Sequence, residues 1–101
     1  MDSSTAGELQ IYSVEERDVA AATCIVRCVG GVARTGQQFK IRSTTDVTGD
    51  PSILILDWIN RYEKMMDFID PPHSATVHLS GNGVTVLKRG VILTSVANDE
   101  P

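Results

Sequence analysis

Residues 30–41 read Gly-Gly-Val-Ala-Arg-Thr-Gly-Gln-Gln-Phe-Lys-Ile, a pattern that predicts a turn followed by a strand. The three glycines allow the positive φ angles that a hairpin loop requires. In the following strand, apolar Phe39 and Ile41 alternate with basic residues, so one face is expected to be buried. The runs 23–29 and 53–58 are predicted to be strands that lie against this one.

Short apolar or alternating runs recur along the rest of the chain, separated by residues typical of turns. Alternation with period two predicts half-buried strands, and a continuous apolar run predicts a strand covered on both faces. About six such strands predict an all-β fold, a small six-stranded antiparallel barrel that is closed or nearly closed. The predicted strands are 8–14, 23–29, the segment around Phe39 and Ile41, 53–56, 75–79 and 91–96.

The length and charge of the chain are those of one ordinary domain. The chain has 101 residues and a formal net charge of −4, with a pI near 4.9. This acidic balance argues against direct binding to nucleic acid or to an anionic membrane. We assign residues 8–96 to a single barrel domain, 43–51 to a loop, and 1–7 and 97–101 to flexible tails.

The sequence carries no sign of export or membrane insertion. It contains no apolar run of about 20 residues that would span a membrane. Residues 1–4 lack the basic and apolar regions of a signal peptide. We therefore expect a cytoplasmic protein with reduced thiols.

Three motifs stand out: Ala-Thr-Cys-Ile-Val-Arg at 22–27, Gly-Val-Ala-Arg-Thr-Gly-Gln at 31–37 and Leu-Lys-Arg-Gly-Val-Ile-Leu at 87–93. Together they resemble the second domain of the translational GTPases, of which elongation factor Tu is the best-known member. In that family a strand leads into a Gly-x-x-x-x-Gly turn, here Gly31 and Gly36, and an Arg-Gly-x-x-Leu ending closes a six-stranded barrel. The resemblance implies an adaptor domain that packs on a GTP-binding domain and helps to hold the acceptor end of a charged tRNA.

Two parts of the family pattern are missing. The sequence contains no Gly-x-x-x-x-Gly-Lys-Ser/Thr phosphate loop, so we expect no GTP hydrolysis by this chain. The family segment that grips the aminoacyl end carries a glutamate and, three residues later, an arginine. The nearest positions here are Asn60 and Glu63, so neither charge is kept. The resemblance also favours an extended conformation for 60–69, whose apolar residues fit either a helix or a strand.

Cys24 and Cys28 lie on the same face of the predicted strand 23–29. At 3.3 Å per residue their Cα atoms are about 13 Å apart, too far for a disulfide or a shared zinc ion. We interpret both as buried, reduced core thiols.

No other residues form a catalytic or metal-binding pattern. His73 follows two prolines, His78 points away from the apolar face of its strand, and both are interpreted as surface residues. The carboxylates Asp57, Asp67 and Asp70 could pair as an acid and a base, but no spacing distinguishes them from an ordinary charged surface. We expect no catalytic residue, no cofactor and no metal.

The span between Val19 and Thr45 contains no acidic residue. If Cys28 and Phe39 point inward and pair across the turn, Arg27 lies opposite Lys40. Opposed like charges destabilise by a few tenths to about 1 kcal/mol, so this face is either screened by salt, solvent or a nearby carboxylate, or it receives an anionic partner. The basic candidates for partner binding are Arg27, Arg34, Lys40 and Arg42.

The apolar run 53–56 offers a second candidate surface. If its two isoleucines face the core, Leu54 and Leu56 face outward. They are then covered either by another part of the chain or by a partner, because an exposed apolar patch usually marks an interface. We therefore include both leucines among the candidate partner-binding residues.

Two hypotheses about function follow. The first is a non-catalytic, free-standing barrel that docks on a protein or ribonucleoprotein partner and has a filled interior. The alternative is a small-ligand-binding or enzymatic barrel, which requires a cavity of several hundred Å³ lined by convergent polar groups. Self-association into a homo-oligomer is compatible with the sequence and would appear as a concentration-dependent mass.

Overall fold

The computed structural model describes residues 6–42 and 53–96. Within them the chain forms strands of two to ten residues and one 3₁₀ helix, and the abundance of β-branched residues favours the strands. The elements are β1 (Glu8–Arg17), β2 (Ala21–Gly30), β3 (Ala33–Arg34), β4 (Gln38–Arg42), β5 (Ile53–Arg61), β6 (Lys64–Met66), β7 (Phe68–Ile69), β8 (Ser74–Ser80), η1 (Asn82–Val86) and β9 (Ile92–Ser95).

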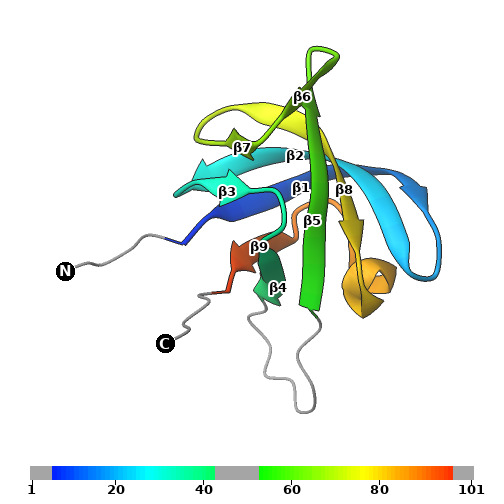
Figure 1. Ribbon diagram of the computed structural model, residues 1–101. Helices are drawn as coiled ribbons and strands as arrows, with labels where there is room; N and C mark the ends of the chain where they lie inside the picture. Colours follow the sequence, from blue (N-terminus) through cyan, green and yellow to red (C-terminus); the bar gives the residue numbers. More distant parts are fainter. Residues whose placement is uncertain (1–5, 43–52, 97–101) are drawn as a thin grey trace.

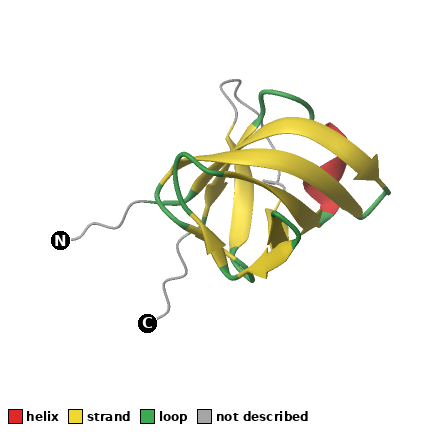
Figure 2. Ribbon diagram, turned by 90° about the horizontal axis from the view of Figure 1, so that it is seen from above, coloured by secondary structure: helices red, strands yellow, loops and turns green. Residues whose placement is uncertain are grey.

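Six strands form a closed antiparallel barrel, as the sequence predicts. The strand order is β4-β9-β1-β2-β8-β5, and pairing of β4 with β5 closes the ring. β6 continues the sheet beyond β5, and β3 pairs with β7 in a separate two-stranded sheet. The hairpin of β5 and β6 extends past the end of the barrel (Figure 1). Seen from above, the strands surround a common centre (Figure 2).

The barrel interior is filled by apolar side chains. Along β2 and β8, buried and less buried residues alternate strictly, as expected for strands with one face on a core. Among the described residues, no polar or charged residue is buried. The largest fully buried side chains are Phe39, Leu9, Ile11, Leu54, Leu56, Ile59, Leu79, Leu87, Leu93, Val26, Val77 and Val84.

Bulges bend the strands so that the ring can close. The register of β1 against β2 shifts at three places, and that of β5 against β8 shifts between Leu56 and Trp58. Bulges increase local twist and re-aim side chains. In β5 the shift leaves both Asp57 and Trp58 outside the core before Ile59 turns inward.

The expected hairpin between the strand 23–29 and the strand at Phe39 is wrong. β2 pairs with β1 and β8, and Cys28 faces Leu9. Phe39 faces Leu54 and Ser95 instead. The glycine-rich segment leads first into β3, which pairs with β7, because Gly31 (φ 56°) and Gly36 (φ 87°) each redirect the chain. The expected pairing of β4 with β5 is confirmed.

The orientation expected for the run 53–56 is also wrong. Leu54 and Leu56 are completely buried, whereas Ile53 is intermediate and Ile55 is 36% exposed. Leu54 lies opposite Phe39, and Leu56 lies opposite Leu79. Four consecutive apolar residues contain no alternation, so only these tertiary pairings decide which of them face the core.

The segment 60–69 is extended, as expected. β5 continues to Arg61, Tyr62 and Glu63 form the turn, and β6 and β7 follow. Both turn residues have positive φ, 54° and 65°, the combination that a tight type I′ hairpin requires.

The predicted loop 43–51 lies outside the described residues, as do 1–5 and 97–101 of the predicted tails. Gly7, which the sequence analysis assigns to the N-terminal tail, is buried, and its N–H donates to Ser95 Oγ (2.8 Å). In the part of the chain that the structure describes, no helix is long and apolar enough to cross a membrane.

Candidate binding groove

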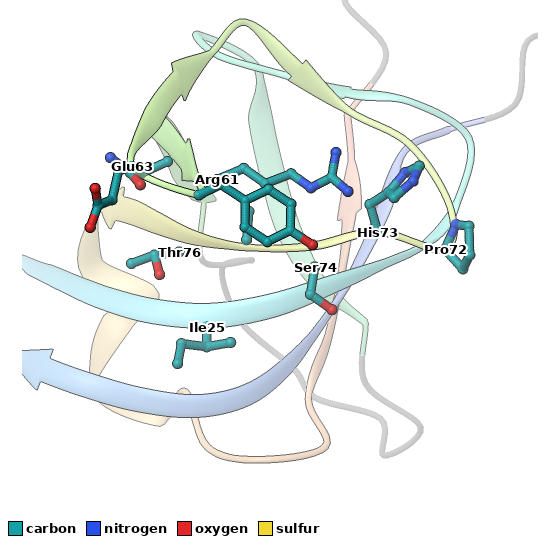
Figure 3. A pocket seen from close by; sticks show the side chains of 10 residues that line it. Ile25, Arg61, Glu63, Pro72, His73, Ser74 and Thr76 are labelled. Carbon is teal, nitrogen blue, oxygen red and sulfur yellow. The ribbon is translucent and has the colours of Figure 1, made fainter.

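A groove of about 540 Å³ lies on the outer face of the barrel, over β2, β8 and the end of β5 (Figure 3). Its position follows from the strand pairings, because Thr76 on β8 faces Ile25 on β2 and Asn60 on β5. The β5–β6 turn forms one wall, and the chain entering β8 forms the far end. Its lining residues are Ile25, Asn60, Arg61, Tyr62, Glu63, Pro72, His73, Ser74, Ala75 and Thr76.

An arginine stacked on a tyrosine lines the groove. The Arg61 guanidinium carbon lies 5.0 Å from the centre of the Tyr62 ring, a cation–π contact. Tyr62 is 84% exposed. The Arg61 Nε atom is buried and has no hydrogen-bond partner among the described residues. Figure 3 shows the Arg61 side chain extending toward His73, while the Glu63 carboxylate lies at the opposite end.

The far end of the groove is held by hydrogen bonds across the turn that precedes β8. His73 Nδ1 lies 3.2 Å from both the carbonyl oxygen and Oδ1 of Asp70. Arg27 Nε donates to the Pro72 carbonyl oxygen (3.2 Å), which brings a second guanidinium to this end. The groove is therefore acidic at Glu63 and basic around Arg61 and Arg27.

A second polar cluster lies farther along the same outer face. His78 Nδ1 is 2.8 Å from Asp57 Oδ2, and Ser80 Oγ donates to Asp57 Oδ1 (3.2 Å). The His78 ring stacks on Trp58, with centroids 5.6 Å apart and planes 20° apart. In a nucleophilic triad the serine donates to the histidine. Here Ser80 donates to the aspartate, so the cluster lacks an activated nucleophile.

His78 also borders a smaller hollow of about 370 Å³ between the β1–β2 hairpin and β8. Among the described residues, no group of three or more histidine, cysteine, aspartate or glutamate side chains could hold a metal ion.

Cys24 and Cys28 are both free and fully buried, as expected. Burial raises the pKa of Cys24 to about 11. Burial also raises the pKa of Cys28, whose thiol donates to the carbonyl oxygens of Gly30 (3.4 Å) and Gly31 (3.8 Å). Neither thiol has the lowered pKa of a reactive cysteine.

The basic candidates do not form one face. Arg27 faces Gln10 and Ser74, so the expected pair with Lys40 does not exist. Lys40 faces Ile53 and Thr94 on the other side of the ring. Arg34 lies opposite Phe68 in the small sheet, and Arg42 opposite Ile92 on β9. Of the three whose side chains the structure describes, Arg27, Arg34 and Lys40, only Arg27 is bonded to a residue that lines the groove.

Sequence reasoning missed both the groove and the His78 cluster. Asp57 and His78 are 21 residues apart, and they meet only because β5 pairs with β8. The family resemblance pointed to this region, since Asn60 and Glu63, the positions nearest to the glutamate and arginine of the family, both line the groove.

The architecture is that of a translation-factor barrel of the elongation factor Tu domain 2 type. A solved structure of this kind is translation elongation factor SelB from Methanococcus maripaludis in its apo form, with a TM-score of 0.73 and 13% sequence identity. The match covers 89% of this chain and 19% of the factor, so the chain spans a small part of that protein's length. No protein-family model and no curated protein matches the sequence. At this identity the likeness establishes the fold alone.

Proposed function

We propose that this chain is a non-catalytic binding module, a translation-factor-like barrel that docks on a protein or ribonucleoprotein partner in the cytoplasm. The observation that carries the proposal is the groove. It presents exposed aromatic, charged and hydroxyl side chains on the outside of a barrel whose described interior is entirely apolar. Tyrosine and arginine, which Tyr62 and Arg61 supply here, are enriched where proteins meet.

The charged contacts of the proposed interface centre on Arg27 and Arg61, which lie toward the same end of the groove. Arg34, Lys40 and Arg42 remain candidates for separate contacts, because they lie on other strands. The fully buried Leu54 and Leu56 cannot touch a partner, so Ile55 replaces them as the apolar candidate on the outer face of β5.

A small-ligand site is the second candidate, because the groove has the volume and polar lining that such a site needs. Its position on the outer surface, with a tyrosine that is 84% exposed as one wall, favours an extended occupant over an enclosed small molecule. The His78 cluster lacks the serine–histidine contact that nucleophilic catalysis requires. These features favour docking.

Affinity capture from native lysate with the intact chain tests the proposal. We expect a discrete partner whose retention falls as salt rises, since exposed charge contacts are screened. Arg27→Glu should reduce retention, and single Arg34→Glu, Lys40→Glu and Arg42→Glu variants show whether other basic residues contribute. A parallel measurement of mass against concentration identifies self-association. Absence of any partner above the bare matrix, with a mass that stays monomeric, would overturn the proposal.

A further inference from the structure

We infer that the groove binds an extended segment of a protein partner, with an acidic side chain of the segment at Arg61 and a basic side chain at Glu63. The inference rests on the proposed docking function and names the occupant of its site. Three observations carry it: the opposite charges at the two ends of the groove, the stacking of Arg61 on Tyr62, and the polar and apolar side chains at the bottom of the groove.

The two ends of the groove carry opposite charge. Glu63 lies at one end, and the Arg61 guanidinium extends toward His73 at the other (Figure 3). Arg27 reinforces the basic end through its bond to Pro72. Such a surface is complementary to a chain with charges of both signs at separate positions, and complementarity of this kind sets orientation and register.

Arg61 is positioned to accept a carboxylate. Stacking on Tyr62 holds the guanidinium in place, so less side-chain entropy is lost when it binds. Its Nε–H is buried and unpaired within the described part of the chain, so it is out of reach of a ligand in the groove. A carboxylate in the groove would instead pair with the positive charge of the guanidinium, which strengthens the hydrogen bonds that the guanidinium donates.

The floor suits a peptide backbone. Asn60, Thr76 and Ile25 lie side by side on three neighbouring strands. The amide and hydroxyl groups can bond backbone N–H and C=O groups of an extended segment, and Ile25 can contact an apolar side chain. Ser74 continues the hydroxyl row along β8, on the same face as Thr76.

The rim offers one large side chain from the strained turn. Tyr62 is 84% exposed, and it and Glu63 are the two non-glycine residues with positive φ among the described residues. Backbone strain of this kind is concentrated at functional sites. Tyrosine is also a common hot-spot residue.

The same features disfavour a nucleic-acid strand. Each nucleotide carries a phosphate, whereas Glu63 lines the groove and Asp70 flanks it at His73. The net charge of the chain is −4. A polyanion would carry negative charge past both carboxylates, whereas a segment of mixed charge can place its basic side chain at Glu63 and its acidic side chain at Arg61.

The test is selection from a phage-displayed library of random peptides of about nine residues, which span about 30 Å when extended. The full chain is the bait. We expect enriched peptides to carry an acidic and a basic residue at a fixed separation and to bind with micromolar Kd. Arg61→Glu should weaken them about tenfold or more, as loss of a charge pair does. The double change Arg61→Glu with Glu63→Arg should select peptides with the opposite order of charges.

Lys88→Glu is the matched control, because it makes the same change of charge at an exposed residue outside the groove. Circular dichroism checks that each variant is folded. If Arg61→Glu does not fold, Glu63→Arg alone replaces it in the test. Three outcomes would overturn the inference: no enrichment, peptides indifferent to all groove changes, or tighter binding of an oligouridylate of about twelve nucleotides than of any peptide. A lysate partner that ignores the groove variants would leave the docking function standing and reject only this site.

Discussion

His78 on β8 and Asp57 on β5 are joined by a 2.8 Å contact between Nδ1 and Oδ2, with each side chain about one-third exposed. Pairs this accessible to solvent contribute about 1 kcal/mol or less. We predict a coupling of about 0.5–1 kcal/mol in a double-mutant cycle with Asp57→Ala and His78→Ala. Urea unfolding of the unchanged chain, the two single variants and the double variant measures this coupling. A coupling indistinguishable from zero would show that the Trp58 stack, and not the carboxylate, holds His78.

Cys24 should make unfolding stability sensitive to alkaline pH. Its pKa is about 11 in the fold and 9.0 without it. Between these values the unfolded thiol loses its proton while the folded one keeps it, so stability is intact below pH 9 and falls as pH rises toward 11. Cys24→Ala should cost about 1–2 kcal/mol at pH 7 and flatten this decline. Rapid labelling of the native thiol by a polar reagent at pH 7 would contradict its burial.

Glu63→Gly should stabilise the β5–β6 turn. Glu63 has φ 65°, which glycine adopts without steric cost. We expect a gain of about 1 kcal/mol in the free energy of unfolding. Thermal unfolding measures the gain, and Lys64→Gly, one residue into β6, is the control that should destabilise. A loss of stability in Glu63→Gly would mean that the carboxylate makes a compensating contact.

Gly81 should be intolerant of a side chain, whereas Gly36 should be only mildly affected. An added Cβ at Gly81, the N-cap of η1 with φ 136° and ψ 175°, would lie 2.3 Å from the Ile53 carbonyl oxygen. At Gly36 it would meet nothing within 4 Å, and only the positive φ opposes it. We predict a cost of about 3 kcal/mol or more for Gly81→Ala and about 1 kcal/mol for Gly36→Ala. Equal costs in denaturant unfolding would refute the difference.

The chain should neither bind nor hydrolyse GTP. Its sequence contains no phosphate-cradling loop. Calorimetric titration of the folded chain with GTP and magnesium should give no heat of binding. Micromolar affinity in that titration would require a nucleotide site of a different kind.

The all-β barrel was predictable from local patterns. Alternation in β2 and β8 is strict, so Cys24 and Cys28 were correctly assigned to the core, and His78 to the face opposite the apolar one. The glycines of the Gly-x-x-x-x-Gly motif were recognisable because few other residues tolerate their backbone angles. The extended conformation of 60–69 was predicted from the family resemblance, because the spacing of its apolar residues fits either a helix or a strand.

Tertiary structure decided which residues of β5 face the core and which strands pair with β2. Leu54 and Leu56 face the core because they meet Phe39 and Leu79. An unbroken apolar run does not itself indicate which of its residues point inward. Arg27 and Lys40 are separated because β9 and β1 lie between β4 and β2 in the ring. The chain between β2 and β4 instead forms β3, which pairs with β7 in a sheet of two residues per strand. Strands this short leave almost no periodicity in a sequence.

The candidate site also exists only in three dimensions. Arg61, His73 and Ile25 come from three parts of the chain, and pairing of β2, β8 and β5 brings them to one groove. The sequence by itself determined which residues can be buried and where the chain can turn, because those properties depend on each side chain and its neighbours. Closure of the barrel decided which strands pair, and therefore which surface residues meet. Backbone hydrogen bonds form equally well in many pairings, so only packing of the core selects one register among them.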